Sequence, residues 1–180
     1  MQIKRTTVEK IRIEGIERSH SLDPVEVIVE NFGEGRGKIT VSCYGEVWTG
    51  FWGSMGGTVE QFFQRVSNDY LIGKMSDYQS TVPDPDSDQD YIRSLILKER
   101  RRQVYGKDEA RRAWRYVDYE RPDRNTLCNF STPEELRPIE GIEEPWYLDW
   151  PKMENHKYKY LSRILDLVRE VIKPDEQRSV

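Results

Sequence analysis

Residues 25–44 contain two segments with period-two hydrophobicity, separated by a glycine-rich turn. The first is VEVIVENF at 25–32, and the second is KITVSCY at 38–44. Alternation with a period of two places the apolar side chains of a strand on one face. The intervening GEGRG at 33–37 is short and flexible enough to reverse the chain. The pattern therefore predicts an antiparallel hairpin with one buried face.

The remaining periodic segments predict an α+β fold, in which a small antiparallel sheet packs against amphipathic helices mainly on one face. A helix is indicated where apolar residues recur at i, i+3 and i+4, and the first helix begins at the capping box Thr58-Val59-Glu60-Gln61. The predicted strands lie near 7–13, 25–32 and 38–48. The predicted helices lie near 58–72, 90–104 and 158–173.

The length of 180 residues predicts a single domain over residues 1–180. Within it, DYQSTVPDPDSDQD at 77–90 contains two prolines, five aspartates and no basic residue. This composition is typical of an exposed acidic loop. Pro174 ends the last helical pattern, and the tail at 174–180 is expected to fray.

The composition limits which partners the protein could bind and in which cellular compartment it would be found. The chain has 28 basic and 32 acidic residues, a formal charge of −4, so any contact with nucleic acid must be local. Its two cysteines, Cys43 and Cys128, form no CxxC pair and are expected to be reduced thiols. There is no signal-like apolar segment and no run of about 18 apolar residues. We therefore expect no membrane association and a cytoplasmic protein.

The sequence shows no recognisable catalytic or metal-binding pattern. His20 and His156 lie outside nucleophile and metalloprotease motifs, and neither GxSxG nor HExxH occurs. The run at 84–90 begins like a calcium loop, but Gln89 and Leu95 occupy the positions that require Gly and Glu. We therefore predict no catalytic residue, no metal ligand and no cofactor. An enzyme whose groups converge from distant positions is the remaining alternative.

The segment CYGEVWTGFWGSMGGTVEQFF at 43–63 places two tryptophans and five glycines between a strand-like and a helix-like segment. A phosphate cradle would suit that order, but the segment has no lysine before its threonine. The favoured interpretation is that the aromatic rings pack over the sheet, with glycines permitting close turns. A partner-binding face is the alternative. The residues interpreted as fold-defining are Trp48, Trp52, Met55, Phe62 and Phe63.

Charge is most uneven between residues 93 and 115, where nine basic residues accompany three acidic ones. With aromatic residues interleaved, this segment could follow a nucleic-acid backbone. The favoured alternative is a solvated helix face whose arginines pair with the acidic loop upstream. The candidate partner-binding residues are Asp84, Asp86, Asp88, Asp90, Arg100, Arg101, Arg102, Arg111, Arg112 and Arg115.

Residues 37–75 resemble a family of small proteins encoded by tailed phages and prophages. The resemblance rests on a strand that leads into a W-x3-WG-x-MG segment, here Trp48 to Gly56, and then a helix with an FF pair. YKYLSRI at 158–164 is similar to the C-terminal helix of that family. The resemblance implies an accessory protein in the cytoplasm of an infected or lysogenic bacterial host, with no assigned catalytic residue.

Together these observations predict a non-enzymatic protein that acts by binding a host macromolecular complex. Such a protein could be an inhibitor of host defence. The expected partner is a host or phage protein. The alternative is nucleic-acid binding through 93–115 during phage replication or recombination. The oligomeric state is not predicted.

Overall fold

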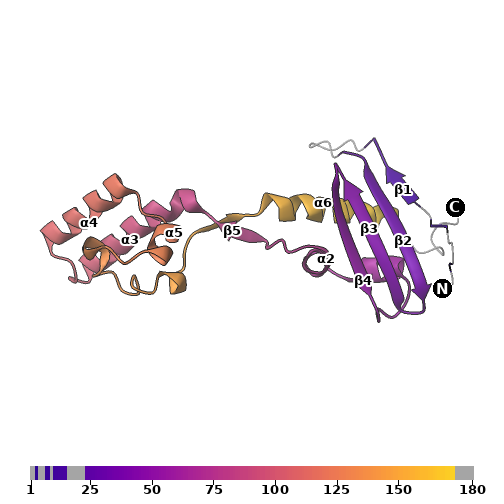
Figure 1. The fold of residues 1–180 in the computed structure, drawn as a ribbon, viewed down its shortest axis with the longest axis horizontal. Helices are drawn as coiled ribbons and strands as arrows, with labels where there is room; N and C mark the ends of the chain where they lie inside the picture. The colour runs from indigo at the N-terminus through magenta and orange to yellow at the C-terminus, as the bar shows by residue number, and fades with distance from the viewer. Residues whose placement is uncertain (1–2, 4–6, 9, 16–22, 173–180) are drawn as a thin grey trace. The chain divides into compact units, whose positions relative to one another are not determined.

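The computed structural model describes residues 3, 7–8, 10–15 and 23–172 (Figure 1). The chain divides into two compact units, both within the span expected to form one domain. The first unit combines residues 1–80 with 155–180, and the second comprises residues 81–154. The second unit is therefore inserted into the chain of the first. The tail at 174–180 lies outside the described residues.

The first unit contains a four-stranded antiparallel sheet whose strands follow one another in chain order. These are β1 (Lys10–Ile13), β2 (Val25–Gly33), β3 (Arg36–Cys43) and β4 (Glu46–Trp52). The predicted hairpin is confirmed: β2 pairs with β3, with Val27 opposite Val41. Opposed residues share a face of the sheet, so the alternating valines of both strands point the same way.

The strand predicted over 38–48 is wrong in extent, because the chain reverses within it. β3 ends at Cys43 and β4 begins at Glu46. Between them Tyr44 and Gly45 have φ of 49° and 81°, as in a two-residue hairpin turn. Asn-Gly or Asp-Gly would have signalled this turn, whereas tyrosine seldom adopts a positive φ. As a result, both tryptophans of the segment 43–63 lie on a fourth strand, β4.

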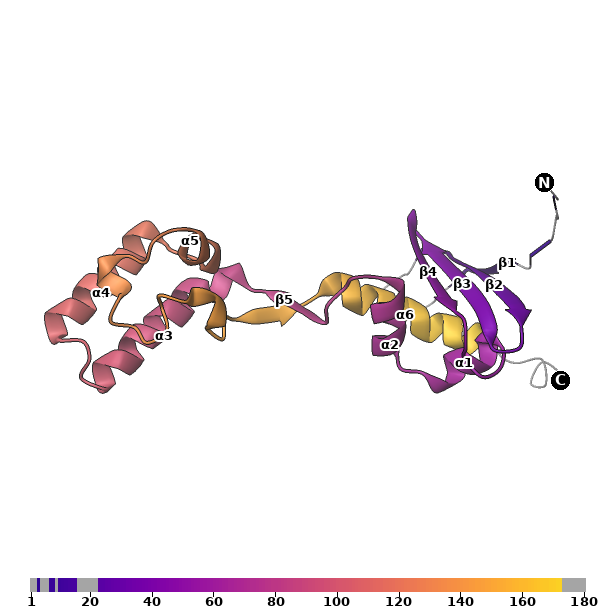
Figure 2. The same ribbon diagram turned by 60° about the horizontal axis from the view of Figure 1, so that its bottom comes forward.

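Helices α1 (Val59–Arg65), α2 (Asn68–Met75) and α6 (His156–Val171) cover one face of this sheet (Figure 2). The capping box at the start of α1 is present. The single helix predicted over 58–72 is wrong, because Val66 is extended and Ser67 starts a new helix. The Ser67 hydroxyl caps α2 by accepting from the Tyr70 backbone N–H. The last predicted helix corresponds to α6.

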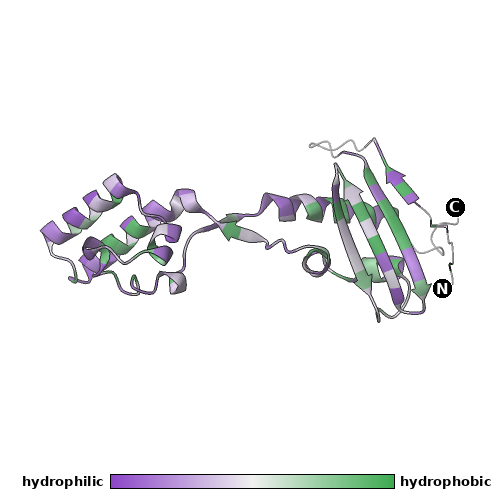
Figure 3. Ribbon diagram, viewed as in Figure 1, coloured by the Kyte–Doolittle hydropathy of each residue, from purple (hydrophilic) through white to green (hydrophobic). Residues whose placement is uncertain are grey.

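The first core lies between these helices and the inner face of the sheet. It includes Val25, Val27, Ile39, Val41, Trp48, Trp52, Phe63, Leu71, Leu161, Ile164 and Val168. The opposite face carries ion pairs instead, such as Lys10 with Glu26 and Lys38 with Glu30. Figure 3 shows the resulting alternation of hydrophobic and hydrophilic positions along the strands. This division explains the period-two pattern of the sequence.

The five residues interpreted as fold-defining lie in or against the first core: Trp48, Trp52, Met55 and Phe63 are buried and Phe62 is partly buried. The Trp52 ring centroid lies 5.3 Å from that of Phe62 and 6.2 Å from that of Phe63. Its indole N–H donates to the Tyr70 hydroxyl at 3.2 Å. The segment therefore contributes much of the aromatic packing of this unit.

The second unit is mainly helical. It contains α3 (Asp88–Arg101), α4 (Lys107–Glu120) and α5 (Arg124–Asn129), and the short 3-10 helices η1 (Pro85–Ser87), η2 (Glu134–Leu136) and η3 (Pro145–Tyr147). β5 (Thr81–Pro83) pairs antiparallel with β6 (Lys152–Glu154), which joins the two ends of the unit. The second core comprises Ile92, Ile96, Tyr105, Ala113, Val117, Leu127, Leu136, Ile139, Ile142 and Trp150.

The α+β fold class is confirmed, but one helix that was predicted to pack against the sheet packs in the second unit instead. The helix expected near 90–104 is α3, and its buried Ile92 and Ile96 contribute to the second core and not to the face of the sheet. The loop expected over 77–90 is also interrupted, since it includes β5, η1 and the first residues of α3. Within the described ranges, no helix has the length and hydrophobicity that a membrane crossing requires.

Candidate functional site

Two of the four candidate aspartates make hydrogen bonds within the second unit. Asp84 is half-buried and accepts a hydrogen bond from the Ser87 hydroxyl at 2.7 Å. Asp88 is only 3% exposed, and its Oδ2 accepts from the backbone N–H of Arg124 at 2.9 Å. Asp88 caps the start of α5 in this way, so its interpretation as a surface contact is wrong. Burying a carboxylate costs free energy, and this hydrogen bond offsets part of that cost.

The other two aspartates are exposed, but only one of them meets a nearby arginine. Asp86 has no ion pair among the described residues, whereas Asp90 pairs with Arg93 at 2.6 Å. Arg93 also pairs with Asp118 of α4 at 2.7 Å and lies 5.8 Å from the centre of the Trp114 ring. The four aspartates therefore do not form one continuous negative surface.

The burial of Asp88 leads to a pH-dependent prediction. Burial raises the pKa of Asp88 and outweighs the Arg124 N–H, which favours the carboxylate. From an unfolded value of about 3.9 up to the raised folded value, the folded state binds more protons, so this group makes stability fall as pH rises. Asp88→Asn keeps an oxygen for the Arg124 N–H but does not titrate. We expect wild type to lose stability relative to Asp88→Asn across that window.

Urea titrations of both proteins at closely spaced pH values measure this difference. Taking the difference between the two proteins removes the contribution of carboxyl groups that do not interact with Asp88. A constant difference between the two proteins from pH 4 upwards would contradict the prediction.

Three of the six candidate arginines are engaged by neighbouring groups. Arg100 donates to the Tyr105 carbonyl at 3.3 Å, Arg102 pairs with Glu99 at 3.1 Å and Glu140 at 2.5 Å, and Arg111 pairs with Asp108 at 3.4 Å. The other three, Arg101, Arg112 and Arg115, are exposed. Over the part of the chain that the structure describes, these three make no hydrogen bond or ion pair. The predicted pairing with the acidic loop therefore does not neutralise them.

Two of the unpaired arginines lie on the solvent side of α4. Arg111, Arg112, Arg115 and Tyr119 recur at helical spacing and form one stripe, here termed the α4 basic face. On the opposite side, Ala113 and Val117 are buried in the second core. Figure 3 shows α4 mostly in hydrophilic colours. Tyr119 lies outside the window of 93–115, and only its spacing from Arg115 connects it to the basic residues in the sequence.

The α4 basic face is a local feature of an acidic unit. Residues 81–154 contain 13 basic and 17 acidic side chains. Arg112 borders a cavity of about 510 Å³ with Glu109, Glu134 and Glu135, without an ion pair to any of them. Any attraction of an anionic partner is therefore short-ranged and should weaken with salt.

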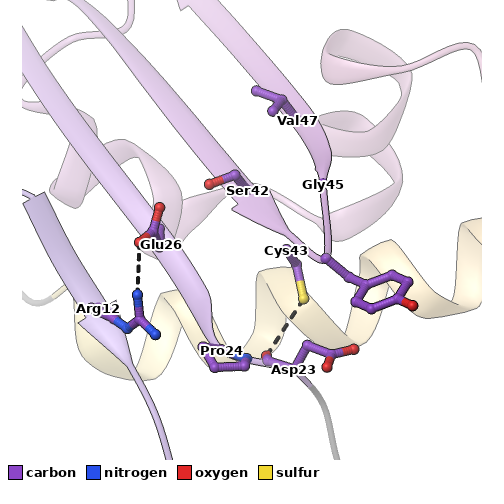
Figure 4. A pocket seen from close by; sticks show the side chains of 9 residues that line it. Arg12, Asp23, Pro24, Glu26, Ser42, Cys43, Gly45 and Val47 are labelled. Carbon is purple, nitrogen blue, oxygen red and sulfur yellow. Dashed lines mark hydrogen bonds and ion pairs between the residues drawn. The ribbon is translucent and has the colours of Figure 1, made fainter.

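A second cavity, of about 450 Å³, lies at the end of the sheet in the first unit (Figure 4). The Cys43 thiol points into this region and donates to the Asp23 carbonyl at 3.5 Å, and its sulfur lies 3.1 Å from the Tyr160 hydroxyl. Burial raises the pKa of the Cys43 thiol and outweighs the hydrogen bond to Tyr160. The thiol is therefore protonated near neutral pH and is not an activated nucleophile.

Three charged side chains, Arg12, Asp23 and Glu26, also line the cavity at the sheet end. Arg12 pairs there with Glu26 at 3.2 Å, so this guanidinium is already neutralised. Among the described side chains, no group of three or more His, Cys, Asp or Glu is placed to hold a metal ion. The cavity at the sheet end therefore offers no unpaired guanidinium group, whereas Arg112 and Arg115 of the α4 basic face have no ion pair among the described residues.

Comparison with known proteins shows that the chain is similar to phage proteins. A family model described as a phage family matches residues 1–174. No curated protein and no solved structure matches the chain. The family match covers both units, including the whole of α4.

Proposed function

The chain belongs to a phage protein family, and we propose that it is a non-enzymatic accessory protein that binds another macromolecule through the α4 basic face. The partner is a host or phage complex with an anionic surface. The candidate partners are a complex of host defence and one of nucleic-acid processing, and inhibition of host defence is one role that this binding would serve. In this proposal the W-x3-WG-x-MG segment is the fold-defining signature of the family.

The observation that supports the proposal is the state of Arg112 and Arg115. Both guanidinium groups are exposed on one side of a helix, and neither has a carboxylate partner within the described residues. An arginine offers several N–H donors in a planar arrangement that matches carboxylate and phosphate groups. Such residues are enriched among those that dominate the energy of interfaces.

The proposal assigns no catalytic step to the cavity at the sheet end. The Cys43 thiol is kept protonated by burial, and its hydrogen bonds go to groups of the same unit. Arg12 beside it pairs with Glu26. These contacts support a structural role for this part of the first unit.

The test is capture of partners from bacterial lysate by the tagged full chain, with and without nuclease. We expect Arg112→Glu with Arg115→Glu to abolish capture, because two charge reversals make the α4 basic face repel an anionic surface. The matched control is Arg36→Glu with Arg163→Glu, which makes the same change of charge at two exposed positions of the first unit.

Capture must be lost in the first variant and retained in the second, with unchanged far-UV circular dichroism in both. If the α4 variant captures the same partner as wild type, the assignment of the surface is wrong. If the control variant also loses capture, net charge and not the α4 basic face explains the binding.

A further inference from the structure

We infer that the ligand of the α4 basic face is single-stranded nucleic acid, with Tyr119 as the platform on which one base stacks. This inference rests on the proposed function, because it requires the α4 basic face to be the contact surface. It adds the chemical class of the ligand and the aromatic residue that distinguishes a single strand from a duplex.

Tyr119 is the most exposed large apolar side chain of the second unit, at 86%. Within the described residues, its ring packs against no other aromatic ring and its hydroxyl makes no hydrogen bond. A ring left in water contributes little to folding, because stabilisation follows the apolar area that is buried. Both faces of the ring are therefore open to a ligand.

The position of Tyr119 relative to Arg115 suits one nucleotide. The two residues are four apart on α4, so their Cβ atoms lie about 5–6 Å apart on the same side of the helix. A guanidinium binds the phosphate, and a neighbouring ring stacks on the base of the same nucleotide. Arg111 and Arg112, one turn earlier, continue the basic stripe along the backbone of the strand.

The charge of the unit favours a single strand over a duplex. Binding a duplex through its phosphates alone draws on many basic contacts, whereas the α4 basic face has three arginines, one of them paired with Asp108, within a unit of net negative charge. Stacking adds affinity that does not depend on charge, and it requires bases that are not already stacked in a helix. A single strand satisfies both conditions.

Fluorescence anisotropy with the full chain tests this inference. The probes are a labelled oligothymidylate of about 16 nucleotides and a labelled duplex of equal length at the same salt concentration. We expect tighter binding of the single strand. Tyr119→Ala should weaken that binding at least about fivefold, and Tyr119→Phe should restore it, because phenylalanine keeps the ring.

The matched control is Tyr147→Ala, which removes a ring that is 79% exposed but lies in η3 of the same unit. It should bind the oligothymidylate as wild type does. Equal affinity for both probes, unchanged in Tyr119→Ala, would overturn the stacking inference.

Two further outcomes separate this inference from the proposed function. If wild type binds neither probe but captures a nuclease-resistant protein in an Arg112- and Arg115-dependent manner, the ligand is a protein. The inference then fails and the proposed function stands. If neither nucleic acid nor protein binding depends on these arginines, both fail.

Discussion

Replacing Trp52 by alanine should lower the free energy of unfolding of the first unit by about 3–5 kcal/mol. The Trp52 side chain is 5% exposed and packs against Phe62 and Phe63. Its removal takes this contact area out of the core and leaves a cavity that the surrounding strands and helices fill only in part. The Tyr70 hydroxyl also loses its indole partner.

The matched control for this prediction is Trp146→Ala, since Trp146 is 53% exposed and lies in η3 of the second unit. Its loss should change stability by less than about 1 kcal/mol. Urea unfolding followed by far-UV circular dichroism measures both variants, with each transition fitted separately because the chain has two units. Similar losses in the two variants would contradict the role of Trp52 as a core residue.

Gly37→Ala should destabilise the first unit by about 1–3 kcal/mol, because the site has no room for a methyl group. A Cβ at Gly37 would lie 2.3 Å from Cγ2 of Val59, 2.9 Å from the carbonyl oxygen of Glu30 and 2.9 Å from Cε of Met55. The backbone oxygen belongs to the neighbouring strand β2 and cannot move without disturbing the pairing of β2 with β3. The methyl group therefore forces α1 away from the sheet.

The same substitution at Gly73 should have the opposite sign. Gly73 is an exposed residue of α2, and a Cβ there would meet nothing within 4 Å. Alanine at a helical position stabilises by about 0.5–1 kcal/mol relative to glycine. Thermal unfolding of the two variants should therefore shift the midpoint of the first unit down for Gly37→Ala and up for Gly73→Ala. Shifts of the same sign would disprove the difference in packing.

The elements with strong local patterns were predictable. The hairpin of β2 and β3 follows from period-two hydrophobicity, and α6 follows from its apolar residues at helical spacing. The Thr58 capping box also marked the start of α1. In each case the signal lies within one element and its immediate neighbours, so it can be read without knowing the rest of the fold.

Other elements gave weak or misleading local signals. β4 was missed because the Tyr44-Gly45 turn lacks the usual residues of a two-residue hairpin. The interruption between α1 and α2 depends on Ser67, whose capping role competes with continuation of an otherwise apolar helical pattern. At both places the same residues fit two local structures, and packing selected one of them.

The candidate site was likewise predictable only in part. The sequence located the basic segment and placed Arg111, Arg112 and Arg115 close together, but it did not show which guanidinium groups are paired. Asp88 appeared to belong to an exposed acidic loop, yet it is buried and accepts a hydrogen bond from the backbone N–H of Arg124, which lies 36 residues further along the chain. The burial of Asp88 and the pair of Arg102 with Glu140 depend on residues that are adjacent only in space, whereas the pair of Arg111 with Asp108 is local to one helix.

By itself, therefore, the sequence determined the α+β class, the sheet hairpin, the last helix and the location of excess positive charge, because periodicity and composition are local properties. Only the tertiary structure decided that α3 joins a second core, that 81–83 pairs with 152–154, and that Arg112 and Arg115 of α4 have no carboxylate partner among the described residues. The second core and the pairing of 81–83 with 152–154 depend on contacts between segments distant in the chain, whose energies outweigh local preference.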